Sequence, residues 1–187
     1  MLRGTNIILE EISINNLEWL RTQRNDPEIR RYFREWKDIT TDKQLQWYAE
    51  RGNNSNPQHV YFQIMMSKSS TDSSSKSIIG CCGLHYIDWR LGAAEFSVFL
   101  DPMLQGKGYG KEALQLMFNY GFAEAGLRKI WAEVWDNNTA IYLYRKLGFV
   151  DEGIRRQQYY HEGKFGNSFM ISLLREEWEK ASWNSKT

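Results

Sequence analysis

A glycine-rich turn near the middle of the chain has the residue types and spacing that most clearly predict chemistry. The turn joins an expected strand to an expected helix and reads Gln105-Gly106-Lys107-Gly108-Tyr109-Gly110-Lys111. Glycines at alternate positions leave backbone N–H groups unshielded at a helix N-terminus, where the helix dipole adds positive potential. We therefore expect the turn to bind an anionic group such as a pyrophosphate.

Two other phosphate-binding motifs fit this turn poorly. A P-loop needs a glycine at the position of Gln105 and a serine or threonine at the position of Glu112. The segment from Gly108 to Ala113 satisfies the loose dinucleotide-binding fingerprint, and Glu133 follows about twenty residues later. That fingerprint belongs to the first βαβ unit of a parallel sheet, whereas this turn follows an expected antiparallel meander, so the dinucleotide interpretation is disfavoured.

The turn must be positioned by a mixed α+β domain with one sheet. Alternating or apolar runs predict strands over residues 6–12, 60–67, 77–87, 93–100, 129–135, 149–159 and 165–174. Helical spacing of apolar residues predicts helices over 15–24, from 40 or 41 to 52, over 110–125 and over 139–147. The Ser-rich stretch 68–76 is expected to be a solvated hairpin loop.

Composition and charge exclude several classes of protein. A length of 187 residues predicts a single domain over 1–187. The 24 Lys and Arg residues nearly balance the 23 Asp and Glu residues, which argues against the broad basic face that nucleic-acid partners require. No apolar run is long enough to cross a bilayer, and the first residues lack a signal-peptide pattern. We therefore expect a cytoplasmic protein with no membrane partner.

The cysteine and histidine positions predict neither a disulfide framework nor a metal site. Cys81 and Cys82 are adjacent in the sequence, so they cannot form a framework or a Cys-based zinc site. His59, His85 and His161 show no metal-ligand spacing. We expect no metal cofactor.

Two motifs at their expected separation resemble the GNAT superfamily of N-acetyltransferases. The segment from Gln105 to Gly110 fits the family's Gln/Arg-x-x-Gly-x-Gly/Ala motif for the acyl-CoA pyrophosphate, and the segment from Asn137 to Phe149 fits its second signature. The resemblance is strong over residues 93–150, and the order of elements agrees along the chain. It implies acetyl-CoA as co-substrate. It also implies the GNAT fold, a mostly antiparallel sheet of about seven strands with helices on both faces and a V-shaped cleft between two central strands.

The resemblance also implies where acetyl-CoA binds. The pantetheine arm is expected to pair with the backbone of the strand before the turn, and the turn is expected to hold the pyrophosphate. Tyr144 would protonate the departing thiolate, because a phenol with a pKa of about 10 keeps its proton at neutral pH. Asn137 would touch the pantetheine arm or the acceptor, or would only cap the following helix. The residues expected to contact acetyl-CoA are Val98, Phe99, Leu100, Gln105, Gly106, Lys107, Gly108, Tyr109, Gly110, Lys111, Asn137 and Tyr144.

Acetyl transfer to an amine needs a general base, because an alkyl amine is mostly protonated at pH 7. Glu95 is the first candidate, since it lies in the strand that flanks the expected cleft, and His85 on the neighbouring strand is the second. Either residue alternatively has a purely structural role. Cys81 or Cys82 as an acyl-carrying nucleophile would need a paired base. Direct attack in a ternary complex, which is usual in the family, is the favoured route.

Residues 21–37 form the candidate acceptor-binding segment. They include six basic and three acidic residues, for which a solvated connecting helix is the ordinary explanation. The segment also resembles the corresponding region of GNAT enzymes that acetylate nucleotide-linked aminosugars, and of those that acetylate N-termini of ribosomal proteins. Arginines suit a diphosphate, and aromatic rings stack on sugar or base. The candidate acceptor-binding residues are Arg24, Asn25, Arg30, Tyr32, Phe33 and Glu95, with Trp36 as a further aromatic.

Three hypotheses for function follow from these observations. The first is acetylation of a small-molecule amine such as a nucleotide-linked aminosugar. The second is acetylation of a protein N-terminal amine, and the third is a non-catalytic acyl-CoA-binding sensor. A homodimer is a further expectation, with residues 158–160, Trp178 and Trp183 as candidate interface residues.

Overall fold

The computed structural model describes residues 1–35, 37–67, 77–181 and 183. Within this part of the chain, one eight-stranded sheet has the order β1-β2-β3-β4-β5-β6-β8-β7. Its strands are β1 (Leu2–Arg3), β2 (Ile7–Glu11), β3 (His59–Met66), β4 (Ile78–Asp88), β5 (Ala93–Leu100), β6 (Lys129–Trp135), β7 (Val150–His161) and β8 (Lys164–Leu174). The α-helices are α1 (Leu17–Asn25), α2 (Pro27–Arg30), α3 (Thr41–Trp47), α4 (Tyr109–Asn119), α5 (Ala140–Lys146) and α6 (Arg175–Lys180).

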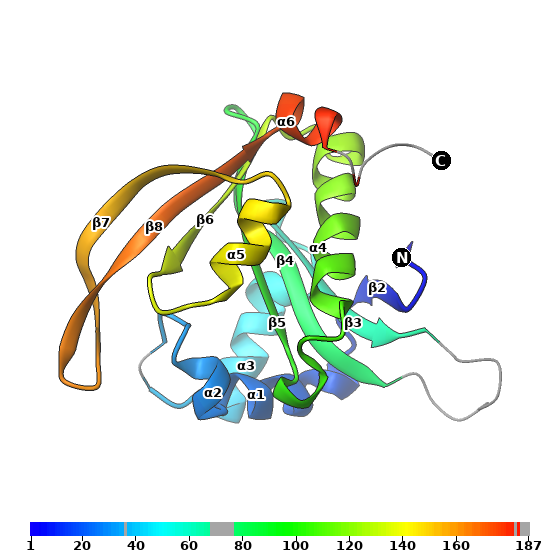
Figure 1. Cartoon of the computed structure of the whole chain (residues 1–187). Coiled ribbons are helices and arrows are strands. Elements are labelled where there is room, and N and C mark those ends of the chain that lie inside the picture. The colour runs from blue at the N-terminus through cyan, green and yellow to red at the C-terminus, as the bar shows by residue number, and fades with distance from the viewer. Residues whose placement is uncertain (36, 68–76, 182, 184–187) are drawn as a thin grey trace.

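Short helical turns extend or precede several of these helices. They are η1 (Ile14–Asn16), η2 (Tyr48–Gly52), η3 (Pro102–Leu104) and η4 (Tyr120–Glu124). Figure 1 shows α4 lying along β4 and β5, and the β7–β8 hairpin reaching past the rest of the sheet. None of the described helices is long and apolar enough to span a membrane.

The expected α+β architecture is confirmed, and all seven strands predicted from the sequence are present. The eighth, β1, pairs through only two residues with β2, which is too short a run to show a period of two. The sequence Asn25-Asp26-Pro27 ends α1 as predicted, but it also begins the additional helix α2. The Asp26 side chain accepts a hydrogen bond from the Glu28 N–H, and Pro27 occupies the first turn. The predicted loop 68–76 and Trp36 lie outside the described residues.

Strands β5 and β6 pair in parallel over a short distance and then diverge. Their paired residues are Ala93 with Lys129, Ala94 with Ile130, and Glu95 with Trp131. Beyond Glu95, β5 continues to pair with β4, while β6 pairs with β8 along its whole length. The V-shaped opening predicted between two central strands is therefore confirmed.

The larger hydrophobic core fixes α4 and α5 on one face of the sheet. The fully buried Phe118 of α4 contacts the rings of Phe96 and Phe149 at centroid distances of 5.2 Å each. Tyr144 of α5 packs edge-on against the same Phe96 ring at 5.1 Å. Because aromatic rings bury large areas and prefer such edge contacts, this cluster sets the position of α5 relative to β5.

A smaller core supports α1 and α3 on the opposite face. Leu20 of α1 packs with Tyr61 of β3 and Cys81 of β4, and Trp47 of α3 meets the Tyr61 ring edge-on at 5.0 Å. Strand alternation directs the adjacent Cys82 into the larger core instead. Both cysteines are free thiols. The two helices on this face are thus held by few buried side chains.

The tryptophans near the C-terminus pack within the chain. Trp178 is buried, stacks on Phe122 and donates from Nε1 to Asn119 Oδ1 at 2.9 Å. Trp183 Nε1 donates to the Leu147 carbonyl at 3.1 Å. The proposed contribution of Trp178 to a dimer interface is therefore wrong, because its side chain is already covered. The homodimer itself stays a prediction.

Candidate active site

A cavity of about 280 Å³ lies at the opening between β5 and β6. Its walls come from both strands, from β4, from the segment after α2 and from α3, and Tyr144 of α5 lines it as well. The cavity therefore brings together residues that the sequence suggested for four separate roles. These are the base candidates Glu95 and His85, the acid candidate Tyr144, the acetyl-CoA candidates Val98 and Phe99, and the acceptor candidates Arg24, Tyr32 and Phe33.

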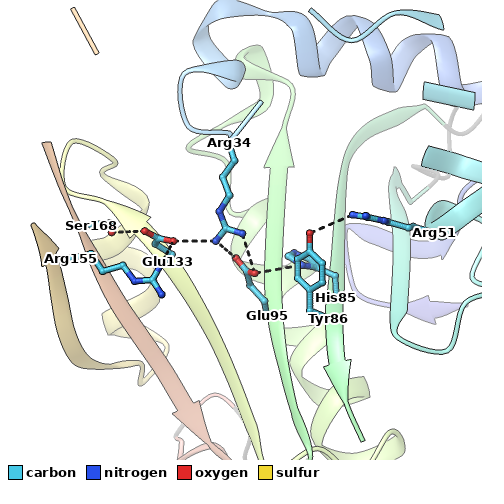
Figure 2. Close-up of polar contacts among 8 residues, drawn as sticks. All are labelled: Arg34, Arg51, His85, Tyr86, Glu95, Glu133, Arg155 and Ser168. Carbon is cyan, nitrogen blue, oxygen red and sulfur yellow. Dashed lines mark hydrogen bonds and ion pairs between the residues drawn. The ribbon is translucent and has the colours of Figure 1, made fainter. Parts of the chain in front are cut away.

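Glu95 is the last residue of β5 that pairs with β6, and its side chain points into the cavity. That side chain is 7% exposed. Arg34 Nη2 donates to Glu95 Oε1 at 2.7 Å, and His85 stands directly opposite on β4. Figure 2 shows the Glu95 carboxylate between Arg34 and His85. Burial raises the pKa of Glu95 above its ordinary value, while the charge of Arg34 and its hydrogen bond partly offset that rise.

Glu133 of β6 brings a second carboxylate to the same place. Its side chain is 4% exposed, and its Oε2 accepts from Arg34 Nη2 and from Arg155 Nη1, each at 3.2 Å. Its Oε1 accepts from Ser168 Oγ at 2.6 Å. Arg34 therefore bridges the two diverging strands through their carboxylates (Figure 2).

His85 is buried, and one of its ring nitrogens has no hydrogen-bond partner within the described part of the chain. Its Nδ1 is 3.9 Å from Glu95 Oε2, which is beyond hydrogen-bond distance. Burial is the main cause that lowers the pKa of His85 to about 3, and the positive charges of His59, Arg34 and Arg51 lower it further. The imidazole is therefore neutral at physiological pH.

Tyr144 is held by α5 with its ring against Phe96. Burial raises the pKa of its phenol above the ordinary value. The hydroxyl group therefore keeps its proton throughout the physiological range and is available to donate it. Tyr144 also lines the cavity, where a proton donor is expected.

The glycine-rich turn has the geometry that anion binding requires. Gly106 and Gly108 have φ values of +74° and +89°, which residues with a Cβ rarely adopt, and the space beside each is open. Gly108 is the N-cap of α4, and no side chain caps the first turn of that helix. An uncapped helix N-terminus with unshielded backbone N–H groups is the kind of feature that binds anions, so the turn stays the predicted pyrophosphate site.

Other predicted acetyl-CoA residues have different surroundings. Gln105 Nε2 donates to the Leu100 carbonyl at 3.3 Å, so this side chain supports the turn from within. Leu100 is buried in the larger core. Asn137 is exposed and does not line the cavity, whereas Asn138 does, and Asn138 Oδ1 accepts from the Ala140 N–H at 3.0 Å. The N-cap of α5 is therefore Thr139, and the side chain that binds the first N–H of the helix is that of Asn138 and not that of Asn137.

Two of the predicted acceptor-binding arginines are paired with carboxylates. Arg24 Nη2 donates to Glu35 Oε1 at 2.7 Å, and Arg30 pairs with Asp38. Only Arg24 of these two lines the cavity at the strand opening. The positive charge of the segment 21–37 is therefore largely neutralised within the protein, which weakens the case for a diphosphate acceptor.

The remaining acceptor candidates divide between structural and cavity positions. Asn25 holds the start of the α3 segment, with hydrogen bonds of 2.9 Å and 2.8 Å to the carbonyl and N–H of Ile39. Tyr32 and Phe33 line the cavity, and the Phe33 ring meets Phe99 of β5 at a centroid distance of 5.8 Å. Asn25 therefore shapes the segment, while the two aromatic residues face the cavity.

Several cavity residues were not singled out from the sequence. Arg34 lies in an irregular segment after α2, where no period marks it. Glu133 was noted only for the disfavoured dinucleotide motif. Tyr86 reaches the cavity because an irregularity between His85 and Asp88 gives it a φ of +52°. Of these three residues, only Glu133 could have been found from the sequence, because a lone acidic residue in an apolar strand is a candidate buried carboxylate.

Comparison with known proteins identifies the class to which this fold and site belong. The family model "Acetyltransferase (GNAT) domain" matches residues 6–150. The chain therefore belongs to the GNAT acetyltransferase family, and it is an acetyl-CoA-dependent N-acetyltransferase.

Individual relatives agree with this membership. An uncharacterized N-acetyltransferase p20 from Bacillus licheniformis is 29% identical over 184 residues, which cover 92% of this chain and 94% of the relative. The spermidine N(1)-acetyltransferase of Escherichia coli K12 is 34% identical over 86 residues, only 46% of each protein. The crystal structure of spermidine N-acetyltransferase from Vibrio cholerae, in complex with CoA and spermine, has a TM-score of 0.83 at 22% identity. It covers 94% of this chain and 99% of that chain.

We predict that Gly108→Val abolishes acetyl-CoA binding, because the valine side chain would fill the open space at the turn. Gly126→Val is the matched control: Gly126 also has a positive φ, +72°, and open surroundings, but it lies at the other end of the α4–η4 segment. Isothermal titration calorimetry with acetyl-CoA should show lost binding only in Gly108→Val. Equal affinity in the two variants would rule out the turn as the binding site.

We also predict that His85 makes the protein less stable in acid. The unfolded chain takes up a proton at the ordinary pKa of 6.5, while the folded protein does so only near pH 3, so stability falls between these values as pH falls. Between pH 7.5 and pH 5, the free energy of unfolding measured in urea should fall by about 2 kcal/mol less in His85→Gln than in the wild type. His161→Gln, at the hairpin tip, should match the wild type. Parallel pH profiles for wild type and His85→Gln would contradict the prediction.

Proposed function

We propose that the enzyme acetylates a primary amine of a small cationic molecule, with a polyamine such as spermidine as the first candidate acceptor. The observation that carries this proposal is the cavity in which two buried carboxylates, Glu95 and Glu133, meet at the strand opening. Buried carboxylates require a cationic partner, and an acceptor ammonium is such a group. Relatives named spermidine N(1)-acetyltransferase support this choice. We further propose that residues 1–187 form one domain.

Glu95 is the proposed general base. The acceptor ammonium must lose a proton before its nitrogen can attack a carbonyl carbon. A carboxylate whose pKa is raised by burial accepts that proton more readily than one with an ordinary pKa. His85 is neutral beside it, and its Nδ1 has no hydrogen-bond partner among the described residues, so it offers a second polar contact to the acceptor nitrogen or to a bridging water.

Acetyl-CoA supplies the acetyl group as an activated thioester. In the proposed arrangement, the backbone of β5 around Val98, Phe99 and Leu100 holds the pantetheine arm along the edge that β6 leaves unpaired. The turn from Gln105 to Lys111 and the first turn of α4 hold the pyrophosphate. Asn137, exposed next to α5, stays a candidate for contact with the pantetheine arm or the acceptor.

Tyr144 is the proposed proton donor to the leaving sulfur. Its raised pKa keeps the phenol protonated until the thiolate, with an ordinary pKa of about 8.5, needs a proton. Burial also raises the pKa of Cys81 to about 12, which disfavours the thiolate that an acyl-carrying cysteine would require. Direct attack by the acceptor amine in a ternary complex is therefore the proposed route.

A panel of amines with acetyl-CoA tests the acceptor class through release of free thiol. We expect turnover with spermidine and other di- or triamines, and less with an aminosugar nucleotide, because Arg24 and Arg30 are already paired with carboxylates. Glu95→Gln should lower kcat by about 10²–10⁴-fold. Glu152→Gln, which removes a carboxylate paired with Lys129 on the surface, should keep the wild-type rate.

Three results of this panel would contradict the proposal. Turnover with the aminosugar nucleotide alone would show that the acceptor is an aminosugar nucleotide and not a polyamine. Turnover of a protein N-terminal peptide alone would show that the acceptor is the N-terminal amine of a protein. Thiol release from no amine, despite tight acetyl-CoA binding, would favour a sensor.

Tyr144→Phe is expected to lower kcat by about 10²-fold while leaving the affinity for acetyl-CoA unchanged, because only the proton is removed. Tyr142→Phe on the exposed side of the same helix is the control, since Tyr142 is 63% exposed. Steady-state kinetics measures the change in kcat, and calorimetry measures the affinity for acetyl-CoA. A wild-type kcat in Tyr144→Phe would remove this residue from the acid role.

A further inference from the structure

The guanidinium of Arg34 is bound to both arms of the strand opening. Its Nη2 donates to Glu95 Oε1 at 2.7 Å and to Glu133 Oε2 at 3.2 Å, and its Nη1 lies 3.4 Å from Glu95 Oε2. Figure 2 shows this side chain descending between β5 and β6 from the segment above the cavity. An internal cation thus lies between the two carboxylates that line the cavity.

The three charged partners differ in how firmly they are held. The two carboxylates are 7% and 4% exposed and lie on central strands, and Ser168 and Arg155 also bind Glu133. The Arg34 side chain is 56% exposed and comes from an irregular segment after α2. The carboxylates are therefore the buried part of this arrangement, and Arg34 is the part that solvent reaches.

A second observation shows that Arg34 does not provide a hydrogen-bond partner for every buried polar atom around it. His85 is only 8% exposed, yet its Nδ1 has no hydrogen-bond partner among the described residues and lies 3.9 Å from Glu95 Oε2. A tetrahedral ammonium has three N–H donors, so one that sits beside these two atoms can donate to both of them. The planar guanidinium reaches the carboxylates and leaves the imidazole nitrogen unpaired.

We propose that Arg34 occupies the site of the acceptor's ammonium group in the free enzyme and is displaced when an acceptor binds. This inference rests on the proposed function, because it assumes a cationic amine acceptor. Arg34 is then a specificity-determining residue. A neutral molecule that removed it would leave two buried carboxylates without this partner, which is strongly unfavourable, so only a cationic group can replace it. The acceptor therefore arrives charged and loses its proton to Glu95 inside the site.

The alternative is that Arg34 is a permanent clamp that holds β5 and β6 at a fixed separation. The two roles predict opposite effects on acceptor binding. Removing a competitor strengthens binding of a cation, whereas removing a clamp disorders the site and weakens binding. Acceptor binding measured without turnover distinguishes these two roles of Arg34, because binding does not depend on the proton-transfer steps.

Isothermal titration calorimetry with spermidine, in the absence of acetyl-CoA, is the test. We expect Arg34→Gln to bind spermidine about tenfold more tightly than the wild type, equivalent to about 1.4 kcal/mol. The matched control is Arg31→Gln, which removes the same charge from a neighbouring residue that pairs with Glu28 and does not line the cavity. This control should bind like the wild type. Unchanged or weaker binding in Arg34→Gln would overturn the proposal.

Two further variants keep the result decisive. Arg34→Lys retains the charge but lacks the planar fork that spans both carboxylates, so its affinity should lie between those of wild type and Arg34→Gln. If Arg34→Gln does not fold, affinity in Arg34→Lys no greater than in the wild type overturns the proposal. Adding Glu95→Gln to Arg34→Gln should remove the gain, and a retained gain would place the binding elsewhere. Tighter binding by Arg34→Gln, together with no acetylation of any amine by the wild type, would contradict the proposed acceptor chemistry while leaving the role of Arg34 intact.

Discussion

The divergence of β5 and β6 beyond Glu95 is the constraint on which the rest of the site depends. Paired strands satisfy one another's N–H and C=O groups, and two strands that separate leave a row of these groups without a partner on the facing edges. Such an edge suits an extended ligand that can take the place of the missing strand. The same divergence directs Glu95 and Glu133 toward each other, so the opening collects negative charge that needs Arg34 or another cation.

Burial then sets the protonation states of the groups in the cavity. It raises the pKa of Glu95 and of Tyr144, and it lowers the pKa of His85 to about 3. Each shift favours the neutral form of the group, as expected when charged forms lose contact with water. The cavity thus holds one carboxyl group with a raised pKa, one neutral imidazole and one protonated phenol. In the proposed mechanism, the carboxyl group removes a proton from the amine and the phenol delivers one to the sulfur.

The sequence predicted the elements well where local chemistry decides them. Gly106 and Gly108 marked the turn because only glycine adopts their backbone angles easily, and the apolar period of α4 marked the helix that follows. The ionic bridge was not predictable in the same way. Arg34 lies in a segment without periodicity, and its partners are 61 and 99 residues away in the sequence. Spacing also could not distinguish Asn137 from Asn138, because a one-residue difference in a turn changes which side chain faces the cavity.

Amide hydrogen exchange along β5 tests the central claim that the unpaired edge of this strand receives acetyl-CoA. Adding acetyl-CoA should slow exchange in residues 97–100 and in the turn 105–111, because new hydrogen bonds form at both places. Exchange in residues 7–11 of β2, none of which lines the cavity, should not change. Protection of the turn without protection of residues 97–100, or of neither, would contradict the account.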